Sequence, residues 1–262
     1  MKALNATLAG IAFVLAGAGS AQAETAVGLV GDNWLVTIEG SKPAITKTMQ
    51  VTGVDRLLGI DVRPANGWLY GVAADGAVVT IDLASGKATQ VAKLDKLIPA
   101  GTGAIVDFNP KADKLRFMST DGTNLRADVD TGKVATDGTL NFESKDMHAG
   151  EKPNIVAAAY TNSSGKPETT AMYDIDATIV ALIQQVSPND GTLKAVGKLG
   201  FKAAKQYAFD IHSVGEGKNT AWLVADNTLY SVDLATGKAA KIGAIEGAKG
   251  MIRDIAVLPK MM

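Results

Sequence analysis

The chain has 262 residues, no cysteine, and 26 basic against 27 acidic side chains, which gives a formal net charge of −1 at pH 7. This near-neutral balance argues against a nucleic-acid partner or an anionic membrane surface, because both need a basic protein surface. Without cysteine the chain has neither disulfides nor zinc–thiolate chemistry, so its apolar core has to stabilise the fold.

The first 23 residues are typical of a secretory signal peptide. Lys2 supplies a positive charge, Leu8–Ala18 is apolar, and Ala21-Gln22-Ala23 fits the small-residue pattern before a cleavage point. The apolar run is shorter than the roughly 20 residues that span a bilayer; an uncleaved anchor is the alternative. We therefore predict cleavage after Ala23 and export to the periplasm or the medium. One mature domain then covers residues 24–262 and has no membrane span.

Short strands in a repeated pattern follow. Residues 59–91 read GIDVRPANGWLYGVAADGAVVTIDLASGKATQV, and the segment DLASGKA at 82–88 returns as DLATGKA at 233–239. Val, Ile, Tyr and Trp favour strands, and the Gly pairs between them are typical of tight hairpin turns. We predict four strands in this unit, at about 59–63, 68–73, 77–83 and 88–94.

The strand that opens each unit recurs along the chain, at Asp61, Asp107, Ala159, Asp210 and Asp254. Intervals of about 45 to 50 residues between such strands are typical of propeller blades. Only one strand's length remains after Asp254, and three strand-like runs precede Asp61. We therefore predict an all-β fold: a five-bladed β-propeller of four-stranded antiparallel blades, in which the C-terminal strand completes the N-terminal blade and closes the ring. A six-bladed ring is the alternative, if the longer third unit hides an extra blade.

Several ordered motifs resemble the bacterial exported proteins grouped as domain of unknown function 4394. They are GIDVRPANGWLYGVAADGAVVTIDLASGKAT at 59–89, VDFNPKADKLRFMSTDGTNLRADVDTGK, AAAYTN and SPNDGTLKAVGKLG, and the resemblance covers essentially the whole mature chain. It implies a propeller-like β fold and an exported bacterial protein, and it brings no activity with it. The chain departs from the family pattern in MYDIDATIVALIQQV (172–186), where a more apolar strand replaces an Asp-rich hairpin.

Acidic residues stand at one apparent register on four of the five inner strands: Asp61, Asp107, Asp210 and Asp254. Inner strands line the channel of a propeller, so these carboxylates are candidates for a site that binds calcium or a cationic ligand, because hard cations prefer several oxygen ligands. The alternative is architectural: each Asp accepts a backbone N–H from the adjoining blade, and nearby arginines such as Arg63 and Arg253 neutralise it. A residue repeated with the blades favours the architectural interpretation.

Two further groups are candidates for contact with a ligand. The hairpin at 114–130 carries Arg116, Asn124 and Arg126 where other units are plainer. The connection ESKDMHAGEKPN (143–154) is the longest and most polar of those that lead into the inner strands, and it carries Asp146 and His148. These connections should gather on one face of the propeller, and loops on a rigid scaffold are common recognition sites.

Catalytic motifs are missing from the sequence. It has no nucleophile elbow, zinc-protease helix or phosphate-binding loop, and its two histidines, His148 and His212, are too few for a histidine metal site. We therefore predict a binding or interaction module that recognises an unknown small ligand or protein on the channel-mouth face. A metal-assisted hydrolase of lactones or glycans that uses the channel acids is one alternative, and a structural component of a surface assembly is another.

Overall fold

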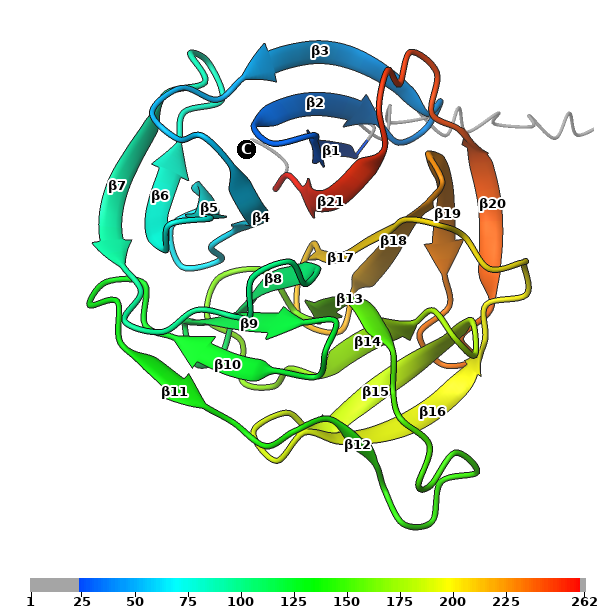
Figure 1. Cartoon of the computed structure of the whole chain (residues 1–262). Helices are drawn as coiled ribbons and strands as arrows, with labels where there is room; N and C mark the ends of the chain where they lie inside the picture. Colours follow the sequence, from blue (N-terminus) through cyan, green and yellow to red (C-terminus); the bar gives the residue numbers. More distant parts are fainter. Residues whose placement is uncertain (1–23, 260–262) are drawn as a thin grey trace, which may run out of the picture.

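The computed structural model describes residues 24–259, and the predicted signal peptide lies outside them. The described residues form 21 β-strands and no helix. The strands make five sheets that surround a common axis (Figure 1). This confirms the five-bladed β-propeller, and the described chain contains no sixth blade.

The two ends of the chain share one sheet, which we call the closing blade. From the centre outward its strands are β21 (Ile252–Val257), β1 (Thr25–Val30), β2 (Trp34–Glu39) and β3 (Ala44–Gln50). β21 pairs antiparallel with β1, with Val257 opposite Ala26 and Asp254 opposite Leu29. The ring therefore closes as predicted, and β1 is paired on both of its edges, with β21 and with β2.

The other four blades follow in chain order around the ring. Blade 1 contains β4 (Leu57–Val62), β5 (Leu69–Ala73), β6 (Ala77–Ile81) and β7 (Ala88–Lys93). Blade 2 contains β8 (Ala104–Asn109), β9 (Lys114–Ser119), β10 (Asn124–Ala127) and β11 (Val134–Thr136). Blade 3 contains β13 (Ile155–Tyr160), β14 (Met172–Asp176), β15 (Ala181–Ser187) and β16 (Thr192–Lys198). Blade 4 contains β17 (Tyr207–Ser213), β18 (Asn219–Ala225), β19 (Thr228–Val232) and β20 (Ala239–Ala244).

Blade 3 differs from the predicted four strands. The short strand β12 (Asn141–Phe142) pairs in parallel with β16, so this sheet has five strands. The chain between blades 2 and 3 runs along the outside of β16 before it returns to the centre, and the loop after β12 projects from the ring (Figure 1). The extra length of the third unit lies between β13 and β14, in residues 161–171.

Apolar side chains between neighbouring blades form the core. β5 and β6 are buried along their whole length, whereas the outer strand β7 is mostly exposed. Tyr70 of blade 1 meets Phe108 of blade 2 edge to face, with ring centroids 5.4 Å apart. Aromatic pairs in this arrangement stabilise a contact beyond the area that they bury.

The repeated DLA[ST]GK segment is a turn that contacts the preceding blade. Asp82 accepts the backbone N–H of Ala84, and Asp233 accepts that of Ala235, both at 2.8 Å. Gly86 and Gly237 both have a φ of 76°. A Cβ on either glycine would lie 2.5 Å from a backbone oxygen of the blade before it. The turn therefore needs glycine for its conformation and for the close approach of two backbones.

No helix long and apolar enough to cross a membrane occurs within residues 24–259.

Candidate functional site

The inner strands of all five blades open onto one cavity of about 640 Å³ at an end of the channel. The strand residues that line it are Leu58 (β4), Ala104 (β8), Val156 (β13), Tyr207 (β17) and Arg253 (β21). The connections before four of these strands line it too, through Arg56, Gly101–Gly103, Asn154 and Ala204–Gln206. The prediction that these connections share one face is therefore confirmed for the four.

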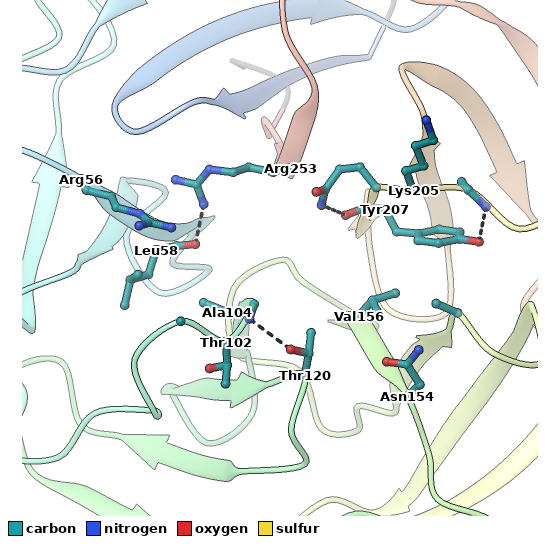
Figure 2. A pocket seen from close by; sticks show the side chains of 15 residues that line it. Arg56, Leu58, Thr102, Ala104, Thr120, Asn154, Val156, Lys205, Tyr207 and Arg253 are labelled. Carbon is teal, nitrogen blue, oxygen red and sulfur yellow. Dashed lines mark hydrogen bonds between the residues drawn. The ribbon is translucent and has the colours of Figure 1, made fainter.

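The wall of the cavity is polar and carries positive charge. Its charged side chains are Arg56, Lys205 and Arg253, and none of its lining residues is acidic. Arg56 and Arg253 lie on the same side of the cavity, and Lys205 lies across it (Figure 2). Neutral polar groups complete the wall, from Thr102, Thr120, Asn154 and Gln206.

Backbone carbonyl groups fix the side chain of Arg253. Its Nε donates to Gly31 O at 2.7 Å and its Nη1 donates to Leu58 O at 2.8 Å, while Nη2 donates to Leu57 O and to Asp32 O. Burial lowers the pKa of Arg253; the nearby Asp254 opposes this, and the positive charge of Arg56 adds to it. The guanidinium is thus held in place by neutral acceptors.

Three of the predicted channel acids come together deeper in the channel. Each of them lies three positions after the residue of its own strand that lines the cavity; they are Asp61, Asp107 and Asp210. They are only 7%, 5% and 5% exposed, and one carboxylate oxygen from each lies within 4.8 Å of the other two. Oxygen ligands at this spacing suit a hard cation such as calcium.

Each of these acids also joins its blade to the next. Asp61 accepts the backbone N–H of Phe108 at 2.6 Å, Asp107 that of Tyr160 at 2.9 Å, and Asp210 that of Val257 at 2.5 Å. These are the inter-blade hydrogen bonds that the architectural interpretation expects. The same carboxylates can therefore tie blades together and face one another across the channel.

The predicted register of Asp254 is wrong. The residue three positions after Arg253 is Ala256, so Ala256 is the β21 equivalent of Asp61. Asp254 lies nearer the mouth and accepts the backbone N–H of Ile60 at 2.8 Å. The interval between units varies along the sequence, so counting could not place the β21 equivalent of Asp61 to within two residues.

Burial and mutual repulsion make the channel acids hard to ionise. Burial, followed by repulsion from the other channel acids, raises the pKa of Asp61 and Asp107 well above the ordinary value of 3.8. Burial raises the pKa of Asp210 to about 6 and that of Asp254 to about 7. A buried carboxyl without a cationic partner favours its neutral form.

The expected arginine partners of the channel acids bind elsewhere, so that part of the prediction is wrong. Arg63 pairs with Asp113 at 2.7 Å and with Asp130 at 2.8 Å. Arg253 donates to the carbonyl groups described above. Both arginines lie at the ends of their strands, where loop carboxylates bind Arg63 and where carbonyl groups of β4 and of the β1–β2 turn bind Arg253.

The predicted ligand-binding group of blade 2 is a buried network instead of a cavity wall. Arg116 is 2% exposed and bonds Asp137 at 2.6 Å and the side-chain oxygen of Asn124 at 2.8 Å. Arg126 reaches the same Asp137 at 3.1 Å. These side chains lie between blades 2 and 3, away from the cavity at the channel mouth, and their contact with a ligand stays a prediction.

Asp146 and His148 are also separate from the cavity. The two oxygens of Asp146 accept the N–H groups of His148 and of Ala195 in β16. The ring of His148 lies 2.9 Å from Glu151 and packs beside Phe142. This loop therefore docks on the outer strand of blade 3, and its role in recognition stays a prediction.

Arg56, Lys205 and Arg253 form a group that sequence reasoning missed. One signal was present, because Arg253 is charged where the other inner strands carry Leu58, Ala104, Val156 and Tyr207. A departure from the repeat at a channel-facing position marks a place where function can be added to a repeated scaffold.

Comparison with known proteins gives a family and a fold. A family model described as "Domain of unknown function (DUF4394)" matches residues 34–256. None of the curated proteins matches the chain. The chain is similar to a solved structural genomics protein of unknown function from Bacteroides thetaiotaomicron, with 16% identity and a TM-score of 0.52. The match covers 91% of this chain and 65% of that protein, so the chain spans less than two thirds of its length.

Two other solved structures align less well. A protein of unknown function from Bacteroides caccae has 9% identity and a TM-score of 0.45, with 91% of this chain and 100% of that one covered. An auxiliary nutrient binding protein from Bacteroides thetaiotaomicron has 12% identity and a TM-score of 0.46, with 82% of this chain and 58% of that one covered. Similarity at such identities concerns the fold alone.

Proposed function

Because the chain belongs to the family described as "Domain of unknown function (DUF4394)", whose description assigns no activity, we propose a function from the geometry of the channel mouth. The protein is an exported binding module that holds a small polar ligand in the cavity there. The observation that carries this proposal is one cavity of about 640 Å³ to which all five inner strands contribute. Ligand sites are typically concave, largely preformed and of this volume.

The lining residues favour binding over catalysis. Among them there is no Cys, His, Asp or Glu that could act as nucleophile or general base. The Thr102 hydroxyl donates to Pro99 O at 2.7 Å, and Thr120 Oγ1 accepts the N–H of Gly103 at 3.0 Å. No carboxylate or imidazole among the lining side chains could activate these hydroxyls by accepting their protons.

A blocking variant tests the proposal. The Asn154 side chain lines the cavity, and its backbone N–H donates to Asp176. Asn154→Trp therefore fills the space and keeps that bond, and it loses the exposed side-chain bond to Thr178. Lys111→Trp, in the exposed turn between β8 and β9, is the matched control. A panel of small polar metabolites is screened by thermal shift on the wild type. Compounds that stabilise the wild type and Lys111→Trp should fail to stabilise Asn154→Trp.

The proposal fails if stabilising compounds act equally on Asn154→Trp, because their site is then elsewhere. It also fails if no compound in a broad panel stabilises the wild type at millimolar concentration, since a ligand present at many times its Kd should raise the melting temperature.

A cation in the channel is the second candidate, and the cluster of Asp61, Asp107 and Asp210 within 4.8 Å favours it. Three carboxylates would supply oxygen ligands, and a bound calcium ion would offset their mutual repulsion. The alternative function of a metal-assisted lactone or glycan hydrolase depends on such an ion. Since protons and cations compete for the same oxygens, binding should strengthen as pH rises.

Calcium-dependent melting tests this candidate. We expect calcium to raise the melting temperature of the wild type, more at pH 8 than at pH 5, and to have little effect on Asp107→Asn, which removes one anionic ligand. Asp82→Asn, in an exposed turn, is the control that keeps the cluster. Equal shifts in all three proteins, or none in the wild type, would remove the channel from consideration as a calcium site.

A further inference from the structure

We propose that the cavity at the channel mouth selects a small hydroxylated organic anion, whose carboxylate or phosphate group lies between Arg56 and Arg253. The inference rests on the proposed function, and it names the class of ligand that the cavity takes. A sugar acid or a sugar phosphate has the required chemistry: a negative group on one side and hydroxyl groups on the other.

The charge on the wall of the cavity is unbalanced. Three cationic side chains line the cavity and no acidic one does. Within residues 24–259 Arg56 forms one ion pair, with Asp32 at 3.5 Å, and the two side chains are 59% and 70% exposed. An exposed pair at that distance contributes little. Among the described residues, the hydrogen-bond acceptors of Arg253 are all backbone carbonyl groups.

Both arginines keep N–H donors that the described contacts do not use. A guanidinium has five N–H groups, and the described contacts of Arg253 use one on Nε, one on Nη1 and both on Nη2. The second N–H of Nη1 is left for a ligand. Arg56 uses only Nε in its contact with Asp32. Arginine donors suit carboxylate and phosphate oxygens, and Arg253 is already fixed, so its ordering costs a ligand little.

The two arginines repel each other. The charge of Arg56 disfavours the charged form of Arg253, which is itself partly buried. An anion between the two would relieve that repulsion, and the partly enclosed cavity would screen the attraction less than bulk water does. A neutral ligand would leave the repulsion in place.

The rest of the wall sets the remaining chemistry of the ligand. Thr102, Thr120, Asn154 and Gln206 offer hydroxyl and amide groups to a hydroxylated body. The volume of about 640 Å³ holds a compound of monosaccharide or disaccharide size. The channel acids lie deeper, and any negative charge that they carry opposes entry of the anionic group beyond the arginines.

A series of probes that share one sugar ring but differ in charge tests the inference by calorimetry. Low ionic strength is used because surface electrostatics are then least screened. The probes are glucose, glucuronate and glucose 6-phosphate, which share one ring, and inorganic phosphate. We expect glucuronate or glucose 6-phosphate to bind at least about tenfold more tightly than glucose, as one charge-assisted hydrogen bond allows. The comparison of the two anions separates a carboxylate from a phosphate as the preferred group.

Two variants place the anion in the cavity. Arg56→Gln should weaken binding of the preferred anion by about tenfold or more, because it removes a cation that contacts the anionic group. The Arg56 side chain is exposed, so the fold should tolerate the change. Lys241→Gln, on the exposed outer strand β20, removes the same charge far from the channel and should leave binding unchanged. Arg253→Lys keeps the charge and loses the planar fork, so it should weaken binding as well.

The outcomes separate this inference from the proposed function. If glucose binds as tightly as glucuronate and Arg56→Gln has no effect, the anionic class is wrong while the cavity remains a ligand site. If none of the four probes binds the wild type, the anionic class is again wrong, and the Asn154→Trp screen decides separately whether the cavity binds anything.

Discussion

The channel carboxylates make the folded protein sensitive to pH. An unfolded Asp has a pKa near 3.8, whereas burial raises the pKa of Asp210 to about 6 and that of Asp254 to about 7. Between about pH 4 and pH 7 the folded state therefore holds more protons than the unfolded state, and its stability falls as pH rises through this window. Acids with a lowered pKa act in the opposite sense, but Asp128, with a pKa of about 2, changes only below the window.

We therefore expect a higher melting temperature at pH 5 than at pH 8 when a chelator keeps cations away. Asp107→Asn keeps an oxygen that can accept the N–H of Tyr160 and removes one of the repelling charges. It should raise the free energy of unfolding at pH 8 by on the order of 1 to 3 kcal/mol and flatten the pH profile. Asp82→Asn is the control with no channel role. A wild-type melting temperature that is constant or rises from pH 5 to pH 8 would contradict this account.

Arg116 and Arg126 share one carboxylate but differ in burial. The Arg116 side chain is 2% exposed, that of Arg126 is 34% exposed, and Asp137 between them is 6% exposed. Arg116 also reaches blade 3 through Asn189 at 3.0 Å and the Tyr160 hydroxyl at 3.2 Å. Removal of a buried partner leaves an uncompensated charge, whereas removal of a more exposed one is partly compensated by water.

Arg116→Ala should accordingly destabilise the protein by roughly 3 to 5 kcal/mol, and Arg126→Ala by about 1 kcal/mol or less. Urea unfolding followed by fluorescence measures both. Similar losses in the two variants would mean that blades 2 and 3 are not joined through Arg116.

At the scale of the element, the turn glycines set the spacing between blades. Gly132 has a φ of 76°, and a Cβ there would lie 2.0 Å from Lys93 O in the preceding blade. Gly67 has a similar φ of 73°, but nothing lies within 4 Å of its Cβ position. The two residues therefore separate the cost of backbone conformation from the cost of a clash between blades.

Gly67→Ala should cost about 1 to 2 kcal/mol, which is the penalty of a left-handed conformation. Gly132→Ala adds a clash with a backbone atom that cannot rotate away, so we expect on the order of 3 kcal/mol or more. Thermal or chemical denaturation of the pair gives the difference. Equal costs would show that the DVDTGK turn of blade 2 does not pack against blade 1 as described.

These elements show what a repeat in the sequence can and cannot predict. The recurring DLA[ST]GK turns and strand spacings predicted the blades, because hairpin chemistry and strand periodicity are local. β12 was missed, since two residues that pair in parallel leave no pattern. The register of Asp254 was wrong because the interval between units varies, so counting along the sequence cannot fix a strand position to within two residues. The sequence predicted that the connections gather on one face of the propeller. The three cations of the cavity come from separate blades, so only their positions in space identify them as a group.

At the scale of the whole molecule, the ring depends on a strand contributed by the C-terminus. Leu258 donates to Thr25 O at 2.8 Å just beyond β21, so residues near the two chain ends are neighbours. β21 also brings Ile252, Ile255 and Val257 into the core, at 1%, 2% and 4% exposure. Without β21 the closing blade has no inner strand, and β1 presents an unpaired edge.

A truncation and a circular permutant together test whether closure, as opposed to the order of the chain, stabilises the fold. Deletion of residues 251–262 should abolish cooperative thermal unfolding and the near-ultraviolet circular dichroism of packed aromatics. The permutant joins residue 259 to residue 24 by a short linker and opens the chain after Gly200, whose Cβ position has no neighbour within 4 Å. It keeps every strand pair, so it should melt cooperatively and within a few degrees of the wild type. Cooperative melting of the truncated chain near the wild-type temperature would show that four complete blades are stable without closure. The channel and its cavity would then form without Arg253 and Asp254.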